Sequence, residues 1–347
     1  MTQKSKHFPI AITSILLSFV ACNALLHYRE QNEVRSLSTG ENISEGTVID
    51  ESNSVEHKDE KEVYQTFMKV MERLQMERKA TLDRNCGRHF AACDVKQSKP
   101  NLRNLYSSRY KFSVCDIQKC GSSSLLQAIL IMEGYYTVDD YFAHRLFGKE
   151  VIQFGKNHVR IGSSGNDTES KTNWENGLKV VLVRHPFHRL VSAYNDKMLG
   201  KSEYYAPLSK EINRRYRSLR YKVSERTAPD SGRATFEDFV NFLVHSSNKD
   251  MHWERFEVIC GPCFHHYDVI AKFETLEQDV TYLENVLKIS DEHKAIFFPS
   301  RERRTNDEKV EGYFSDLSKE LQMKIYEKYK RDFEIFGYEK PSWLCSV

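Results

Sequence analysis

Two segments of this chain each read as a buried strand that runs through a short polar loop into a helix, and they constrain the fold most. In the first, the apolar run Lys111–Ile117 has strand length, and Leu125–Met132 reads as a helix. In the second, Leu178–Val183 is a buried strand, and Pro186 stands where a first helical turn begins. Strands that alternate with helices favour an α/β fold with a central, mostly parallel sheet flanked by helices.

The rest of the chain adds helices and one irregular stretch. We expect helices at Phe236–His245, Leu276–Leu287 and Leu317–Phe333. Residues 201–233 are basic and polar with little periodicity, so we expect a surface insertion there. A chain of 347 residues has room for one large α/β domain with appendages, and we place that domain at residues 86–347.

An uncharged stretch of 19 residues, Phe8–Leu26, stands near the N-terminus. It is about long enough to cross a bilayer as a helix, and Lys4 and Lys6 precede it. By the positive-inside rule, residues 1–7 then form a cytosolic tail, and the large C-terminal part lies on the other side of the membrane. A cleaved signal peptide is the alternative, because Ala21–Ala24 is rich in small residues.

Residues 27–85 connect this anchor to the large domain, and most of them are polar. We expect a lumenal stem there. Five apolar residues near its end recur at helical spacing and predict an amphipathic helix, in a pattern too short to establish a coiled coil: Val63, Phe67, Val70, Met71 and Leu74. The glycosylation triplets that begin at Asn42 and Asn166 agree with a lumenal body.

The cysteines indicate how the lumenal part is stabilised. Seven of the eight lie beyond the uncharged stretch: Cys86, Cys93, Cys115, Cys120, Cys260, Cys263 and Cys345. In an oxidising lumen most of them should pair, and the odd number leaves at least one unpaired or bonded to another chain. Cys260 and Cys263 have the CxxC spacing of zinc and redox motifs, but a zinc site needs a second such pair, and His265–His266 is too closely spaced to supply it. We therefore expect a disulfide framework and no metal site.

The loop Gln118–Ser124, between the first strand and its helix, carries the first candidate site. The formal net charge of +2 argues against a general nucleic-acid binder, so an anion site has to be a local group of residues. Gly121 allows a close backbone approach, the three serines after it offer hydroxyls and first-turn amides, and Lys119 adds a positive charge. The loop predicts a phosphate or sulfate site, although it lacks the Walker A pattern.

The second candidate site follows the strand Leu178–Val183. Arg184 stands at the carboxyl end of that strand, where ligands bind in open α/β sheets, and Ser192 follows about two helical turns later. An arginine fork together with a hydroxyl group suits a terminal phosphate. Taken alone, Arg184 is equally compatible with a salt bridge near the start of a helix.

The two loops together resemble the paired nucleotide signatures of Golgi carbohydrate sulfotransferases, and most of all those of the chondroitin 4-O-sulfotransferases and the natural-killer-epitope sulfotransferase. Gln118–Ser123 looks like that family's 5′-phosphosulfate loop, and Leu182–Tyr194 looks like its 3′-phosphate loop. Later blocks of the family are matched in order by His252–Trp253, Cys260–Cys263, Tyr267–Ile270, Lys272–Glu277 and Tyr329–Tyr338. The resemblance covers about Cys86–Tyr338, and an N-terminal anchor is also typical of the family.

The resemblance implies a P-loop-like sulfotransferase fold and 3′-phosphoadenylyl sulfate (PAPS) as the sulfate donor, with no metal. The first loop would hold the 5′-phosphosulfate and the second would hold the 3′-phosphate. The implied donor-binding residues are Lys119, Cys120, Gly121, Ser122, Ser123, Ser124, Arg184 and Ser192. Lys119 would also act in catalysis, because it is placed to stabilise charge on the leaving phosphate oxygen.

Two residues of the first loop depart from the family pattern. Gln118 stands where the family has proline, which would loosen the preset backbone of the loop. Cys120 is unusual beside a phosphosulfate, and we predict that it is the unpaired thiol. The other six cysteines beyond the anchor would then form three bridges, with 15 possible connectivities.

A sugar hydroxyl that attacks sulfur needs a general base. His252 is the first candidate, because a neutral histidine accepts a proton near neutral pH; His144, Glu257 and Glu274 are alternatives. A purely structural role for His252, packed beside Trp253, remains an equal reading. An acidic glycan would favour a basic groove, and the cluster that could line it comprises Arg214, Arg215, Arg217, Arg220 and Lys222.

The expected function is therefore sulfate transfer from PAPS to a sugar hydroxyl, with N-acetylgalactosamine in chondroitin as the expected acceptor. Alternatives are a terminal glucuronic acid or another glycan, and a non-catalytic glycan-binding relative, which Gln118 keeps open. The missing Walker A pattern disfavours a nucleotide kinase, and the missing D-x-D motif disfavours a metal-dependent glycosyltransferase. Expected partners are a glycan or proteoglycan and the Golgi membrane, with a homodimer as an open possibility and no nucleic acid.

Overall fold

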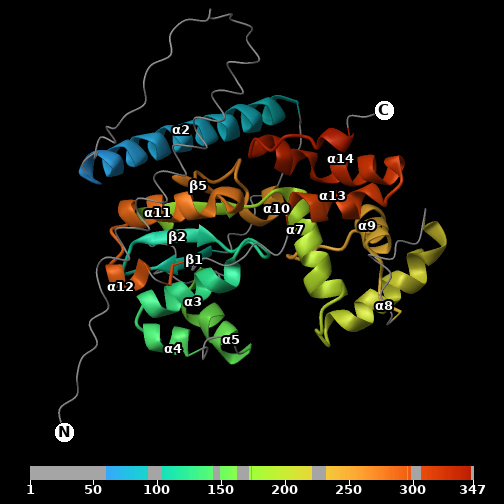
Figure 1. Ribbon diagram of the computed structural model, residues 1–347, viewed down its shortest axis with the longest axis horizontal. Helices are drawn as coiled ribbons and strands as arrows, with labels where there is room; N and C mark the ends of the chain where they lie inside the picture. Colours follow the sequence, from blue (N-terminus) through green and yellow to red (C-terminus); the bar gives the residue numbers. More distant parts are fainter. Residues whose placement is uncertain are drawn as a thin grey trace, which may run out of the picture. The chain divides into compact units, whose positions relative to one another are not determined.

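The computed structural model describes residues 60–92, 104–143, 149–161, 172, 174–220, 232–294, 296–297 and 306–344 (Figure 1). The chain divides into two units, Met1–Leu74 and Gln75–Val347. Three features expected from the sequence lie outside the described residues: the anchor 8–26, the glycosylation triplets and His144. Within the described residues, no helix combines the length and the apolar character that a membrane crossing requires.

The helix expected near Val63 is longer than its five apolar positions indicate, because α2 runs over Glu60–Ala92. Its part beyond Leu74 belongs to the second unit and is fixed there by polar contacts. Arg78 Nη1 donates at 2.6 Å to Asp279 Oδ1 and at 2.7 Å to the backbone carbonyl of Ile270. Gln75 Nε2 also reaches Asp279 Oδ1, at 3.1 Å. These buried bonds attach the helix to a strand and a helix that are about 200 residues away in the chain.

The central sheet has five strands in the order β3-β1-β2-β4-β5. The strands are β1 (Asn104–Ser107), β2 (Phe112–Cys115), β3 (Arg160–Ile161), β4 (Leu178–Val183) and β5 (Val269–Lys272). The pairs β2–β4 and β4–β5 are parallel, whereas β1 pairs antiparallel with both β2 and β3. The expectation of a mostly parallel sheet is therefore wrong for one half of it. The reason is local: a tight turn, with Lys111 at φ 51°, joins β1 directly to β2, and such a short connection permits only an antiparallel pair.

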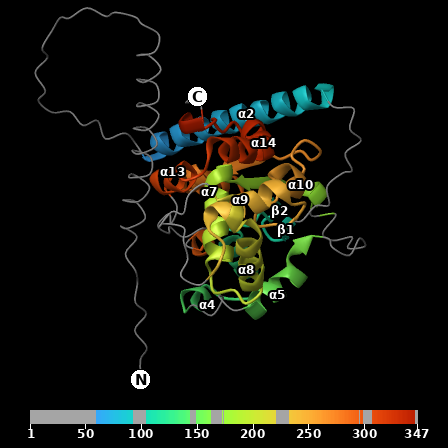
Figure 2. The same cartoon turned by 90° about the vertical axis from the view of Figure 1, so that its right-hand side faces the viewer.

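Helices flank this sheet, as expected for an α/β fold. The first group is α3 (Ser122–Met132), α4 (Val138–Phe142) and α5 (Lys149–His158), on one side of the sheet, and α7 (Pro186–Ala193) follows β4 (Figures 1 and 2). The remaining helices are α8 (Tyr205–Tyr216), α9 (Phe236–His245), α10 (Phe256–Cys260), α11 (Leu276–Val286), α12 (Asp291–Lys294), α13 (Asp307–Ser315) and α14 (Lys319–Ile335). The helices predicted at Phe236, Leu276 and Leu317 correspond to α9, α11 and α14.

The stretch 201–233 is not simply a surface insertion. Its first half forms α8, and the side chains of Tyr205, Ile212 and Tyr216 are buried in one hydrophobic core with α7, α9, α13 and α14. Large aromatic side chains dominate this core; Phe187, for example, stacks on Phe314 with ring centroids 4.2 Å apart. The polar sequence of the segment conceals the helix because only one narrow face of it is apolar.

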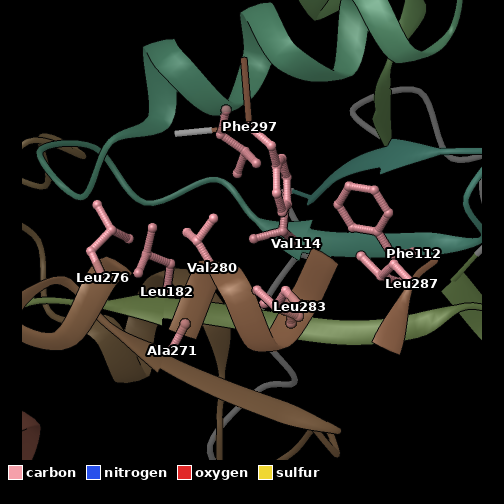
Figure 3. A pocket seen from close by; sticks show the side chains of 11 residues that line it. Phe112, Val114, Leu182, Ala271, Leu276, Val280, Leu283, Leu287 and Phe297 are labelled. Atoms are coloured by element: carbon pink, nitrogen blue, oxygen red, sulfur yellow. The ribbon is translucent and has the colours of Figure 1, made fainter. Parts of the chain in front are cut away.

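A second core lies between the sheet and α11. Phe112, Leu182 and Ala271 from three strands face Val280 and Leu283 of α11, as Figure 3 shows. They enclose a cavity of about 10 Å³ whose lining side chains are all apolar. This volume is that of a single water molecule, and an apolar lining gives water no partners, so the cavity is a packing gap under the sheet.

Two disulfide bonds connect distant parts of the second unit. They join Cys86 to Cys263 and Cys115 to Cys260. The two cysteines of the CxxC motif therefore bond to α2 and to the end of β2 rather than to each other. Cys120 is buried and unpaired, as predicted. The remaining two cysteines expected to pair, Cys93 and Cys345, lie outside the described residues.

Candidate functional site

The loop after β2 turns sharply into α3 at the carboxyl end of the strand. Lys119 adopts φ 72° and Gly121, the N-cap of α3, adopts φ 83°. Both residues lie in the left-handed region, which glycine tolerates and lysine rarely adopts. Two left-handed residues within three positions fold the loop back on itself, so that the helix begins directly at the edge of the sheet.

The N-terminus of α3 has the features of an anion-binding site. No side chain caps the helix, and its first turn contains no acidic residue. Ser122 and Ser123 line a cavity of about 520 Å³. Ser122 Oγ donates at 3.3 Å to Gln118 Oε1, so the departure from the family's proline places a polar side chain against the loop. Uncapped first-turn amides beside an open cavity are the donors that a phosphosulfate needs, and the residues present fit the donor.

Lys119 forms an ion pair with an aspartate that no sequence motif identifies. Its Nζ lies 2.7 Å from Asp196 Oδ2, and Lys197 Nζ lies 3.1 Å from the same oxygen. Asp196 belongs to η1 (Tyr194–Met198), a single π-helical turn that continues α7. Burial lowers the pKa of Lys119 by more than Asp196 raises it. For Asp196 itself, burial raises the pKa, but the bonds and charges of Lys119 and Lys197 outweigh this effect and hold it below its usual value.

The adjacent Cys120 does not offer a reactive group to a ligand. Its side chain is 2% exposed, and burial raises the pKa of the thiol to about 12. The protonated sulfur is a small apolar group in the wall of the loop. Its contribution to a donor site is therefore limited to its backbone.

The two predicted loops meet through Arg184. Its Nη1 donates at 3.0 Å to the backbone carbonyl of Lys119, and its guanidinium lies over the ring of Phe273, 4.5 Å from the centroid. Arg184 is only 6% exposed. Ser192 lies in the last turn of α7 and is partly exposed. Arg184 thus comes together with Lys119. Neither of them lines the large cavity, and Ser192 does not line it either.

Arg189 lies within the second motif, Leu182–Tyr194, but was not among the predicted site residues. The structure shows that it connects two segments of the site. Although it is charged, it is only 1% exposed. Its guanidinium donates to three backbone carbonyls, at 3.0 Å to Gln118, at 2.8 Å to Met251, and at 2.6 Å to Glu254. One side chain therefore connects the first loop to the segment that carries His252.

His252 lies at the cavity that Ser122 and Ser123 also line. Its Nδ1 is 2.7 Å from Asp250 Oδ1, and the Tyr205 hydroxyl donates at 2.7 Å to Asp250 Oδ2. Burial lowers the pKa of His252, and Asp250 offsets only part of that effect. The imidazole is therefore neutral near neutral pH, as a proton acceptor must be.

The other two described candidates for the general base, Glu257 and Glu274, form ion pairs or hydrogen bonds with other groups of the protein. Glu257 forms ion pairs with Arg255, at 2.6 Å, and with Arg331. Glu274 accepts the backbone N–H of His185 at 2.7 Å and the Tyr338 hydroxyl at 2.9 Å. Neither carboxylate lines the large cavity.

Four residues of the basic cluster are described, and none of them lines that cavity either: Arg214, Arg215, Arg217 and Arg220. Lys222 lies outside the described residues. Arg214 pairs with Glu211 on its own helix and is exposed, and Arg220 forms a two-bond ion pair with the buried Asp238. The positive charges at the cavity belong instead to Lys197 and Lys249. Within the described residues, no group of histidine, cysteine and acidic side chains is arranged to hold a metal ion.

Comparisons with known proteins identify the family of the chain. Residues 102–339 match the model of the Sulfotransferase family. The chain is 29% identical to carbohydrate sulfotransferase 9 of Homo sapiens, over 69% of this chain and 54% of that protein. It is 28% identical to carbohydrate sulfotransferase 8 of Homo sapiens, over 78% of this chain and 64% of that protein.

A third relative, carbohydrate sulfotransferase 11 of Rattus norvegicus, is 35% identical over 48% of each chain. The chain thus spans between about half and two thirds of the length of these relatives. No solved structure matches it. The family model nevertheless covers both loops and the His252 segment in one continuous match. This chain belongs to the sulfotransferase family and is similar to its carbohydrate sulfotransferases.

Proposed function

We propose that this protein transfers sulfate from PAPS to a hydroxyl group of a glycan. The observation that carries the proposal is the contact between the two loops, in which Arg184 holds the backbone of Lys119 beside the uncapped start of α3. This contact joins a site for a phosphosulfate and a site for a second phosphate into one binding surface. A donor with phosphates at both ends requires such an arrangement.

When bound, PAPS supplies an activated sulfuryl group on a phosphate leaving group. The first-turn amides and hydroxyls of α3 hold the 5′-phosphosulfate, and Lys119 adds a positive charge beside the leaving oxygen. Arg184 and Ser192 hold the 3′-phosphate, for which a guanidinium fork is well suited. Cys120 and Gly121 contribute backbone only. Burial of Lys119 strengthens its effect, because electrostatic interactions are screened less away from water.

On the acceptor side, His252 takes the proton from the attacking hydroxyl. It is neutral, it lines the cavity, and its Nδ1 is already engaged by Asp250, which leaves Nε2 for the acceptor. The cavity of about 520 Å³ has room for a sugar residue beside Ser122 and Ser123. Lys197 and Lys249 at its wall favour an acidic glycan.

The acceptor we propose is N-acetylgalactosamine in a chondroitin-like chain, attached to a proteoglycan. A terminal glucuronic acid, as in the natural-killer epitope, is the alternative, since the two lysines suit either polymer. We place the protein in the Golgi membrane, anchored by residues 8–26 with the sulfotransferase domain in the lumen. The uncharged stretch and the two disulfide bonds support this location.

A transfer assay with the full-length chain tests the proposal. The chain is incubated with PAPS labelled in the sulfate and with a panel of acceptors: chondroitin, dermatan, desulfated heparan sulfate and a glucuronyl-lactosamine glycan. Lys119→Ala and Arg184→Ala are expected to lose transfer, whereas Arg214→Ala, an exposed control, is expected to keep it. Label on one acceptor names the substrate class. Binding of the spent donor with no transfer to any acceptor would favour a non-catalytic glycan-binding protein.

A further inference from the structure

His252 is held by two groups from different parts of the chain. Asp250 Oδ1 lies 2.7 Å from His252 Nδ1 and also accepts the backbone N–H of His252 at 2.9 Å. The second oxygen, Oδ2, accepts the Tyr205 hydroxyl at 2.7 Å. Tyr205 belongs to α8, more than forty residues earlier in the chain. Both oxygens of the carboxylate are thus engaged, and the aspartate cannot turn away from the histidine.

The segment that carries this pair is itself fixed. Asn248 Oδ1 accepts the backbone N–H of Asp250 at 3.1 Å and the indole N–H of Trp253 at 3.1 Å. Trp253 is 2% exposed, and its carbonyl accepts the hydroxyl of Tyr329 at 2.5 Å. These hydrogen bonds fix the backbone around Asp250 and His252. A side chain that must keep a precise orientation needs such support, whereas a surface ion pair does not.

The carboxylate also determines which nitrogen of the imidazole carries the proton. An ionised carboxylate accepts hydrogen bonds only, so a neutral His252 places its proton on Nδ1. The lone pair then lies on Nε2, to which no hydrogen bond is made within the described residues. Asp250 is itself ionised, because the hydrogen bonds of His252 and Tyr205 outweigh the effect of burial and lower its pKa.

We infer that Asp250 and Tyr205 are positioning residues that hold His252 in the Nδ1-protonated form, with Nε2 directed to the acceptor hydroxyl. The inference rests on the proposed function, in which His252 is the base. It adds two residues, from outside both loops, on which the rate of transfer depends although neither binds the donor. Tyr205 acts through Asp250 and through its own hydroxyl, which lies 3.1 Å from His252 Nδ1, and Asp250 acts through His252.

Two charged side chains, Lys197 and Asp196, lie between Tyr205 and Lys119 of the first loop. Lys197 Nζ lies over the ring of Tyr205, 5.1 Å from its centroid, and pairs with Asp196, which in turn pairs with Lys119. The charged groups that act on His252 are therefore Asp250, which raises its pKa, and Lys197 and Lys119, which lower it, in addition to burial. Lys249 lies at the same cavity.

The two positioning residues predict opposite shifts of the pH profile. Asp250→Asn removes the charge that raises the pKa of His252, so the acidic limb of kcat moves to lower pH. Tyr205→Phe removes a hydrogen bond that disperses the charge of Asp250, so the carboxylate attracts the Nδ1 proton more strongly and the acidic limb moves to higher pH. A merely structural role would lower activity without these opposite shifts.

The rate is measured with the full-length chain and its best acceptor. We expect Asp250→Asn to lower kcat by about 100-fold or more, because general-base assistance is worth roughly 10²–10⁴. The KM for PAPS should stay within about twofold of the wild-type value, since neither residue belongs to the two loops proposed to hold the donor. Two conservative controls, Asp291→Asn on α12 and Tyr204→Phe beside Tyr205, should retain wild-type kinetics; their side chains are largely exposed.

Nitrogen-15 NMR of histidine-labelled protein gives a readout that does not depend on activity. His252 is assigned by its loss in His252→Gln. We expect the Nδ1–H form in the wild type and its loss in Asp250→Asn. The same ring form and the same pH profile in both proteins would overturn the inference. If the wild type transfers no sulfate to any acceptor, the proposed function fails, and the NMR result alone then decides whether Asp250 sets the state of His252.

Discussion

The guanidinium of Arg184 donates a hydrogen bond from Nη1 to the backbone carbonyl of Lys119, 3.0 Å away. The two residues are 65 positions apart and lie in the loops that follow two neighbouring parallel strands, β2 and β4. A residue expected to bind one end of the donor therefore also supports the loop that binds the other end. Any substitution at Arg184 acts on both ends at once.

Substitution of Arg189 is expected to lower both the stability and the activity of the protein. Arg189→Met leaves three part-buried carbonyls without their donor, at a cost of about 1 kcal/mol or more for each unsatisfied group. We expect the free energy of unfolding to fall by about 3 kcal/mol or more, as measured by urea denaturation. Transfer should fall as well, because the side chain joins the donor loop to the His252 segment. Arg214→Met, on the exposed face of α8, is the matched control, and equal stability of the two variants would contradict the role.

Substitution of Lys119 is expected to lower kcat by a larger factor than it raises the KM for PAPS. Lys119→Ala removes the charge that is expected to stabilise the leaving phosphate oxygen, a contribution of roughly 10²–10³ in kcat for a preorganised donor. Steady-state kinetics should show that loss mainly in kcat, with a smaller rise in the KM for PAPS. A variant with normal kcat and a raised KM alone would show that Lys119 binds the donor without assisting the reaction.

Replacement of Asp279 is expected to cause a large loss of stability. It is fully buried and accepts hydrogen bonds from Arg78, Gln75, Thr275 and the backbone of Lys272. Asp279→Ala leaves the buried guanidinium of Arg78 without its partner, which typically costs about 3–5 kcal/mol. Chemical denaturation measures the change, with the exposed Asp291→Ala as the control. A variant as stable as the control would mean that α2 does not depend on this pair.

The cysteines predict a definite peptide map. Digestion without reduction should yield the linked pairs Cys86–Cys263 and Cys115–Cys260. Cys120 should resist alkylation near neutral pH in the native protein and react after unfolding, because burial raises its pKa to about 12. Rapid alkylation of native Cys120, or its recovery in a disulfide, would contradict the structure.

The parts of the fold predicted correctly from sequence are those whose signal is local. The apolar run of β4 and the Pro186 start of α7 depend on neighbouring residues only. The antiparallel β1 was missed although the tight turn at Lys111 that sets its direction is local. The helix α8 was missed because its burial is set by distant partners. Tyr205 and Ile212 are seven residues apart among polar neighbours, and only the packing of α8 against α9 shows that they face a core.

Some residues of the candidate site could be predicted from sequence motifs, and others could be found only in the structure. Lys119 and Arg184 stand in recognisable motifs, and the structure brings them into contact. Asp196, Tyr205 and Asp250 belong to no motif that identifies them, because each acquires its role from a side chain elsewhere in the chain. A carboxylate next to a lysine, as in Asp196–Lys197, or two residues from a histidine, as in Asp250 and His252, is common in any sequence, and only the folded geometry distinguishes these.

Discrimination between two nucleotides tests the central claim most directly. Adenosine 3′,5′-bisphosphate and AMP differ only in the 3′-phosphate, and calorimetry can measure the binding of both to the full-length chain. We predict that the wild type prefers the bisphosphate by about 10- to 100-fold, the value of a charge-assisted hydrogen bond of roughly 1.5–3 kcal/mol. Arg184→Ala should lose most of that preference, and Arg214→Ala should keep it. Equal binding of both nucleotides by the wild type, or no binding of either, would contradict the account.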